Sequence, residues 1–178
     1  MTNGKVRGLD RIDRRILMLL QKDARLPNKE IARAVNLSPT PCLRRLNMLE
    51  EAGYITRYKA VLDPAQLGYS IHAFLSLKRS RDSSREEVSR QIMAIPEVLS
   101  CHVVSGEFDL LVELVARDMD DYARITIDNI AEMPGIYDLR TTFSIRALRR
   151  DGELPVGADP TVAASRTRSS RKSKPGKG

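Results

Sequence analysis

The sequence has little cysteine and no long apolar run, and each of these absences argues against a class of protein. Cys42 and Cys101 are the two cysteines, and neither a CxxC pair nor histidines at zinc spacing accompany them. A structural zinc site and a disulfide framework are therefore not expected. No apolar stretch approaches the roughly 20 residues that span a bilayer, and residues 1–9 lack the apolar core of a secretory signal. This composition predicts a cytoplasmic protein without a membrane segment.

Sequence signatures of catalysis are missing as well. The chain contains no GxGxxG, Walker A, HExxH or GxSxG pattern. His72 and His102 each stand alone on an expected strand, where a histidine is usually a structural residue. Asp118, Asp120 and Asp121 crowd an expected helix start, where the helix dipole favours anions, so they are interpreted as caps. We predict no enzyme activity, no metal site and no cofactor.

The positive charge is unevenly distributed along the chain. Residues 1–60 carry 13 Lys/Arg against 6 Asp/Glu, a net charge of +7. Residues 61–157 carry 11 against 16, a net of −5, and residues 158–178 carry 6 against 1, a net of +5. A basic first third followed by an acidic middle indicates a nucleic-acid module joined to a second domain.

Apolar residues at helical spacing predict three short helices in the first domain, residues 1–62. The first helix is capped by Asp10, the second begins at Asn28, and the third runs from Ser38 to about Ala52. The turn at Asn36 and Leu37 makes the last two a helix-turn-helix. Residues 54–62 are rich in β-formers and are predicted to form a two-stranded wing that contacts a DNA backbone.

The third predicted helix has the features of a DNA-reading helix. Ser38 suits the N-cap and Pro39 the first helical position. Leu43, Leu46 and Leu49 recur at helical spacing and are predicted to face the core, which leaves the arginines free for phosphates and base edges. Cys42 is interpreted as a packing residue. The predicted DNA contacts are Ser38, Pro39, Thr40, Pro41, Arg44, Arg45, Arg57 and Lys59.

The remainder of the chain has a different pattern. After a linker at residues 63–70, residues 71–150 show strands and helices in the order βαββαβ, which is a ferredoxin-like unit. A capping box is predicted at Ser83 and Glu86, and Gly106 is predicted to turn the chain between the two central strands. Residues 151–178 are predicted to be a disordered basic tail that adds phosphate affinity or solubility. The fold class is therefore α+β, with a (winged) helix-turn-helix followed by a ferredoxin-like domain.

Three stretches together resemble the Lrp/AsnC, or feast/famine, family of transcriptional regulators. They are Leu9–Asp13, Leu37–Leu43 and Cys101–Asp109, and the likeness spans about residues 9–150. The resemblance implies a sequence-specific, DNA-binding regulator whose second domain senses an amino acid. Leucine is the first expectation for that effector. The resemblance also implies a homodimer that assembles to octamers or beyond and is associated with the cytoplasmic nucleoid.

The resemblance also places the effector near the loop that joins the two central strands. Backbone N–H groups of such a loop can hold a carboxylate, and Asp109 can pair with an ammonium group. From the residues alone, the favoured explanation is that Gly106 makes a plain turn and that Asp109 caps it. The residues expected at the effector site are Ser105, Gly106, Glu107, Phe108, Asp109, Met119, Phe143 and Ser144.

Two other functions are compatible with parts of the sequence. A ligand-independent architectural DNA-binding protein would share every feature of the first domain, and the basic tail favours it. An enzyme similar to the sirohaem decarboxylases would share the fold. That chemistry would need His or Arg residues converging on a cavity, and the chain offers only His72 and His102 as histidines.

Overall fold

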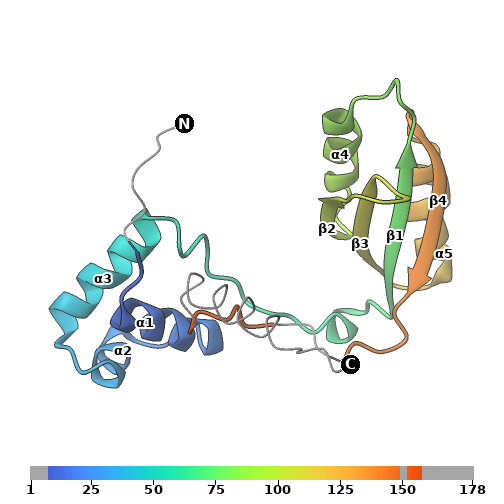
Figure 1. Ribbon diagram of the computed structural model, residues 1–178. Coiled ribbons are helices and arrows are strands. Elements are labelled where there is room, and N and C mark those ends of the chain that lie inside the picture. Colours follow the sequence, from blue (N-terminus) through green and yellow to red (C-terminus); the bar gives the residue numbers. More distant parts are fainter. Residues whose placement is uncertain (1–7, 149–151, 158–178) are drawn as a thin grey trace, which may run out of the picture. The chain divides into compact units, whose positions relative to one another are not determined.

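The computed structural model of the chain describes residues 8–148 and 152–157 (Figure 1). The chain forms two compact units. Of the described residues, one unit comprises 8–60 together with 152–157, and the other comprises 61–148. The chain therefore leaves the first unit once and returns to it after the second unit is complete.

The first unit contains three helices, α1 (Arg11–Lys22), α2 (Asn28–Ala34) and α3 (Pro39–Glu51). A capping box starts α1: the Asp10 carboxylate accepts from the Asp13 N–H at 2.8 Å, and the Asp13 carboxylate accepts from the Asp10 N–H at 3.2 Å. These bonds satisfy two amides that a helix start leaves unpaired. The three predicted helices are confirmed.

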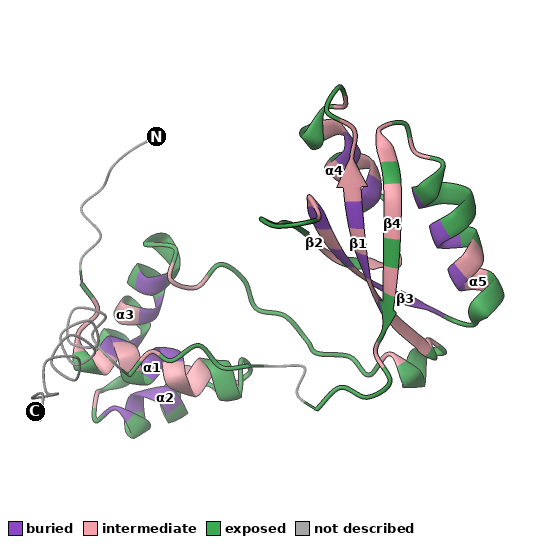
Figure 2. Cartoon of the chain, turned by 45° about the vertical axis from the view of Figure 1, so that its right-hand side comes forward, coloured by how far each residue is buried: buried purple, intermediate pink, exposed green. Residues whose placement is uncertain are grey.

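The core of the first unit lies where the three helices meet (Figure 2). Cys42 is fully buried there, and burial raises the pKa of its thiol. Leu43, by contrast, is 49% exposed. The prediction that Leu43 faces the core is therefore wrong, because Cys42, Leu46 and Leu49 are the residues that repeat on the buried side. The buried side chains are Ile16, Leu17, Ile31, Ala32, Val35, Cys42, Leu46 and Leu49.

The segment that follows α3 contains no strand between Tyr54 and Leu62. A two-stranded wing needs a turn between its strands, and this segment has no glycine, proline, asparagine or aspartate to reverse the chain. The predicted two-stranded wing is therefore not formed by these described residues. The segment is instead fixed to the end of α3, because the Tyr58 hydroxyl donates to a Glu50 carboxylate oxygen at 2.7 Å. Burial and this carboxylate raise the pKa of Tyr58 to about 12.

Residues 152–157 lie against α1 of the first unit. The side-chain amide of Gln21 donates to the Leu154 carbonyl at 3.2 Å and accepts from the Leu154 N–H at 2.6 Å. Arg14 donates to the Val156 carbonyl at 3.0 Å, and Val156 packs against the helical core. The structure thus differs from the predicted disordered tail at residues 152–157, because side chains of α1 bind the backbone of Leu154 and Val156. The rest of that tail, residues 158–178, lies outside the described residues.

The second unit is a four-stranded antiparallel sheet with its helices on one face. The strand order is β2-β3-β1-β4, and the predicted ferredoxin-like order is confirmed. Its elements are η1 (Ala65–Leu67), β1 (Ile71–Arg79), α4 (Arg85–Met93), β2 (Val98–Val103), β3 (Leu110–Ala116), α5 (Met119–Ala123), the π-helical η2 (Arg124–Ala131) and β4 (Ile136–Phe143).

Strand β1 shows how the sheet separates its two faces. Ala73, Leu75 and Leu77 are buried beneath the helices, in one core with Ile92 of α4 and Ile125 of η2. Successive strand residues point to opposite faces, so His72, Phe74 and Ser76 lie on the face away from that core.

The helix caps of the second unit are close to the predicted ones. Ser84, not Ser83, caps α4 by accepting from the Glu87 N–H, so the predicted box is shifted by one residue. The Ser83 hydroxyl instead donates to the Ser80 carbonyl at 2.9 Å. Asp118 caps α5 by accepting from the Asp121 N–H at 2.8 Å, which confirms its predicted capping role.

Candidate functional site

The turn between α2 and α3 holds the two helices of the helix-turn-helix at a fixed angle. Asn36 has a φ of +57°, in the left-handed region, and it follows the end of α2. The Leu37 N–H donates to the Ala32 carbonyl at 2.9 Å and the Asn36 N–H to the Arg33 carbonyl at 3.2 Å. This pair of bonds is a Schellman motif. The Asn28 amide then joins the two helix starts by donating to the Pro39 carbonyl at 2.9 Å.

We expect Asn36→Ala to destabilise the first unit by roughly 1 kcal/mol, because a left-handed backbone is costly for residues other than glycine and asparagine. Asn36→Gly is the matched control and should keep or raise stability. Hydrogen exchange of peptides from residues 8–60, followed by mass spectrometry, measures the opening of this unit directly. Equal exchange rates in the two variants would contradict this account of the turn.

The N-terminal part of α3 presents its predicted DNA contacts to solvent. Ser38 occupies the N-cap position, although its hydroxyl makes no capping bond, and Pro39 starts the helix. Ser38, Pro39, Thr40, Pro41 and Arg44 are all exposed. These exposed side chains at the start of α3 can therefore meet a phosphate or a base edge.

Two residues that the sequence interpretation missed share this exposed face. One side of α3 is formed by exposed residues at helical spacing. These residues are Thr40, Leu43, Arg44 and Asn47. An asparagine can pair bidentately with adenine, and an apolar side chain can contact a thymine methyl group. A helical wheel that starts from Cys42 as the buried residue would have found both Leu43 and Asn47.

Arg45 does not share that exposed face. One of its terminal nitrogens lies 2.5 Å from an Asp10 oxygen and 2.7 Å from an Asp13 oxygen. Its side chain is 22% exposed and that of Asp13 only 9%. Arg45 therefore connects α3 to the start of α1, and we correct its predicted role from DNA contact to structural ion pair.

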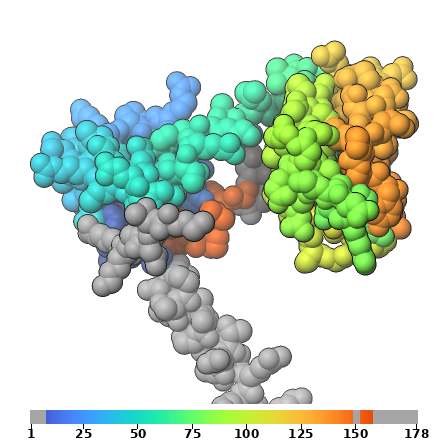
Figure 3. All heavy atoms as spheres, turned by 90° about the horizontal axis from the view of Figure 1, so that it is seen from above, coloured from blue at the N-terminus to red at the C-terminus, as the bar shows by residue number. Residues whose placement is uncertain are grey.

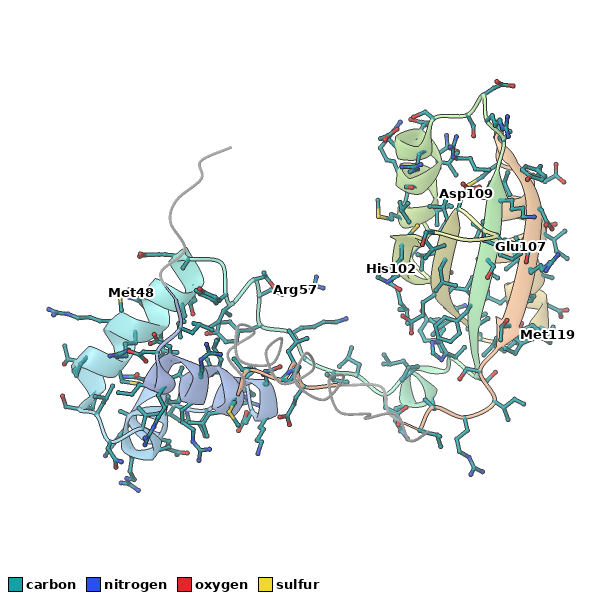
Figure 4. All side chains as sticks on the ribbon, in the orientation of Figure 1. Met48, Arg57, His102, Glu107, Asp109 and Met119 are labelled. Atoms are coloured by element: carbon teal, nitrogen blue, oxygen red, sulfur yellow. The ribbon has the colours of Figure 1, made fainter. Side chains whose placement is uncertain are left out.

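Arg57 (Figure 4) and Lys59 lie on the segment after α3, and both are exposed. No described strand holds them beside α3 as a wing would. Their predicted contact with a DNA backbone therefore rests on their charge and their place in the chain. They remain predictions of phosphate contacts.

The loop between β2 and β3 is folded onto the end of the sheet. Glu107 lies 3.6 Å from Lys78 of β1 and 3.2 Å from Arg140 of β4. The same two cations flank the Phe108 ring, at 5.3 Å and 5.0 Å from its centroid. The loop therefore brings an aromatic ring, two cations and a carboxylate together around the turn at Gly106, whose φ is +132°.

Asp109 has a structural partner in this loop. Its carboxylate accepts from the Arg79 N–H at 2.9 Å, and its own N–H donates to the Leu77 carbonyl at 2.9 Å. This is the capping role that the residues alone also allowed. Ser105 and Glu107 are exposed, whereas Phe108 and Asp109 are half-buried.

The other predicted effector residues lie at the opposite end of the sheet. Phe143 pairs with Ala73, whereas the loop is anchored at Lys78, five residues further along β1. At about 3.4 Å per residue these positions are roughly 17 Å apart. Met119 lies near the Phe143 end, away from Asp109 (Figure 4). A single chain therefore does not bring the two groups of predicted effector residues together.

The residues at that end of the sheet form a small exposed cluster. The Phe143 ring packs on Tyr122 at 4.9 Å between centroids, and the Tyr122 hydroxyl lies 2.5 Å from the Thr141 hydroxyl. Phe143 is 44% exposed and Met119 57% exposed. The Ser144 N–H donates to the His72 carbonyl at 2.8 Å.

Comparison with known proteins agrees with both units. A winged helix-turn-helix DNA-binding family model matches residues 9–56, and the Lrp/AsnC ligand-binding domain model matches residues 72–154. The leucine-responsive regulatory protein of Serratia marcescens is 37% identical over 161 residues, which cover 88% of this chain and 98% of that protein. The chain belongs to the Lrp/AsnC family. It is a DNA-binding transcriptional regulator with a second, ligand-binding domain.

Solved structures of Lrp/AsnC regulators have the same fold. A transcriptional regulator from Neisseria meningitidis, crystallised in complex with L-Met, is 34% identical, with a TM-score of 0.81, and the match covers 84% of this chain and 98% of that one. An AsnC-family regulator from Agrobacterium tumefaciens is 33% identical, with a TM-score of 0.77 and coverage of 83% and 97%. The predicted fold class and family are therefore confirmed.

The histidines of this Lrp/AsnC chain do not converge on a cavity. His72 Nε2 lies 2.8 Å from one carboxylate oxygen of Glu113. The other oxygen of the same carboxylate accepts a hydrogen bond from the Ser100 hydroxyl. His102 is exposed on β2. Within residues 8–148 and 152–157, no group of three metal-ligating side chains gathers. No helix in the same residues is long and apolar enough to cross a membrane.

Proposed function

We propose that this regulator changes its assembly or its DNA affinity when an amino acid binds its second unit. Leucine is the first candidate, because the Serratia marcescens relative is a leucine-responsive regulatory protein, and methionine is the second, because the Neisseria meningitidis regulator was solved with L-Met. Such a ligand acts only through its different affinity for the two states. Its DNA partner would place the protein in the cytoplasm, at the nucleoid.

The separation of the predicted effector residues along the sheet is the observation that carries this proposal. The loop from Ser105 to Asp109 offers backbone amides and the Phe108 ring, and Lys78 and Arg140 place two cations beside that ring. Met119 and Phe143 offer exposed apolar surface at the other end of the sheet. An amino acid needs both polar and apolar surroundings, so we infer that one copy supplies the loop and another supplies the apolar cluster. Amino-acid binding would then depend on a homodimer that assembles further, to an octamer or beyond.

On the DNA side, we propose that Thr40, Leu43, Arg44 and Asn47 read base edges in the major groove. Ser38 and the start of α3 would contact a phosphate, and Arg57 and Lys59 would add phosphate contacts beside the groove. The two α3 helices of a dimer would then read half-sites about one helical turn apart.

The decisive experiment titrates the full chain against DNA from upstream of its own gene, by fluorescence anisotropy at fixed salt, with each of the twenty amino acids in turn. We expect one amino acid to shift the affinity or the stoichiometry. If none has an effect while DNA binding remains tight, the protein is a ligand-independent architectural protein instead.

Met119→Ala tests the apolar half of the proposed effector site. We expect this variant to bind DNA normally without ligand and to need roughly tenfold more amino acid for the same response, because an exposed contact on the ligand is lost. Ile127→Ala is the matched control, since Ile127 is 59% exposed and Met119 57%. An unchanged response in Met119→Ala, or an equal loss in the control, would remove Met119 from the site.

A further inference from the structure

Among the three helices of the first unit, α1 carries the largest net positive charge, and the DNA-reading helix α3 carries none. Helix α3 carries Arg44 and Arg45 against Glu50 and Glu51, and Arg45 is already paired with two aspartates. The sequence of α1 contains four cations, namely Arg11, Arg14, Arg15 and Lys22, against one carboxylate, that of Asp13. Among the three helices, the net positive charge therefore lies mainly on α1, which is not the helix proposed to read base edges.

Three of these arginines line one hollow on the surface of the first unit. The hollow has a volume of about 420 Å³, and none of the described residues that line it is acidic. Arg14 is turned toward residues 152–157, where it donates to the Val156 carbonyl. Arg11 and Arg15 are exposed, and neither takes part in an ion pair with any described residue. The lining residues are Arg11, Ile12, Arg14, Arg15, Met18, Ala34, Val35, Asn36 and Gly157.

Helix geometry places this arginine surface on the side of α1 opposite α3. Asp13 points toward α3, because its carboxylate holds Arg45. At about 100° per residue, Arg15 lies roughly 200° around the helix from Asp13, and Arg11 roughly 160° from it in the same sense. The visible face of the first unit in Figure 3 is formed chiefly by α3 and the chain that follows it. Arg11 and Arg15 therefore point away from α3, and the hollow that they line reaches Val35 and Asn36 in the turn before α3.

The cations on this side of α1 form a row and not a single point. Lys22 lies roughly 180° around the helix from Asp13, so Arg11, Arg15 and Lys22 follow one line along α1. From Arg11 to Lys22 this line is about 16 Å long, at about 1.5 Å per residue. A single small anion would neutralise only part of such a row. A polyanion with closely spaced charges, such as the DNA backbone, would neutralise all of it.

We propose that this row on α1 binds the phosphates of a second segment of duplex DNA while α3 reads the first. Contacts of Arg11, Arg15 and Lys22 with backbone phosphates would be independent of sequence and strongly weakened by salt. Each helix-turn-helix unit would then hold two DNA segments on opposite sides. This goes beyond the regulation proposed above and does not depend on any amino-acid effector.

The test uses the full chain, saturated with a labelled operator duplex, and a second duplex without the operator that carries a different label. Co-capture of the second duplex on the protein–operator complex measures the proposed contact. For Arg11→Ala/Arg15→Ala we expect the second duplex to bind roughly tenfold more weakly and its salt dependence to become shallower. The affinity for the operator itself should stay within about twofold of wild type. The matched control is Arg81→Ala/Arg85→Ala, which removes the same charge from exposed positions of the other unit.

Each outcome decides for or against the proposal. Loss of second-duplex binding in the α1 variant alone, with an unchanged oligomeric state by analytical ultracentrifugation, supports it. An equal loss in the control variant would show that only net charge matters. A comparable loss of operator affinity would show that α1 contacts the same duplex as α3. Unchanged binding of both duplexes would show that the row is an ordinary solvated surface.

Discussion

Arg45→Ala is expected to destabilise the first unit by about 3 kcal/mol, because it leaves a nearly buried Asp13 carboxylate without its cation. The unit would open, and operator affinity would fall only as far as the folded fraction falls. Hydrogen exchange of peptides from residues 8–60 measures the opening, while peptides from β1–β4 report the intact second unit. If DNA binding were lost with unchanged exchange, Arg45 would be a DNA contact after all.

The pH dependence of the same variant provides a second test. Burial raises the pKa of Asp10, but hydrogen bonds from the Asp13 N–H and from Arg45 outweigh this effect, so the pKa lies below the ordinary value of 3.8. A lowered pKa in the folded state means that the stabilisation is present above the unfolded pKa and is lost as the pH falls through the folded one. The stability difference between wild type and Arg45→Ala should therefore be full at pH 7 and shrink below about pH 4. A difference that stays constant down to pH 2 would exclude the ion pair as its cause.

Arg45 also shows where inference from the sequence reaches its limit. Periodicity and caps predicted three helices and the turn, because the apolar spacing, Asp10 and Asn36 act on their own neighbours. The partners of Arg45 are 32 and 35 residues away, and no local pattern records such a pairing. Two adjacent arginines on a helix look alike in the sequence, yet Arg44 faces solvent and Arg45 faces α1.

The same limit explains the other differences. Cys42 and Leu43 are adjacent and both apolar, so helical spacing alone allows either one to be the buried residue. The choice is settled only by the packing of Leu46 and Leu49 in the core. Residues 152–157 are held by side chains more than 130 residues earlier. Their composition, rich in glycine and proline, gives no indication of that contact. The ferredoxin-like order was predictable because the spacing of apolar residues distinguishes each strand from each helix. The separation of the effector residues depends on which residues of neighbouring strands are paired, and that spacing does not show the pairing.

Arg44→Ala is expected to weaken operator binding by 10- to 100-fold, which corresponds to about 1–3 kcal/mol for a bidentate base contact. Arg44 is exposed on the face of α3 that also presents Thr40 and Asn47, and the structure shows no described ion pair that its loss would break. Fluorescence anisotropy with an operator duplex and with an unrelated duplex distinguishes a base contact from a phosphate contact. Loss of a base contact reduces the affinity for the operator much more than the affinity for the unrelated duplex.

Arg44→Lys distinguishes base reading from simple charge at this position. A lysine keeps the positive charge but has no planar pair of donors for a guanine edge. If Arg44 reads a base, the lysine variant should bind the operator almost as poorly as the alanine variant. If Arg44 only neutralises a phosphate, the lysine variant should recover most of the affinity, and the alanine variant should reduce the salt dependence by about one unit. Arg25→Ala, an exposed arginine outside α3, controls for net charge and should leave the preference for the operator unchanged.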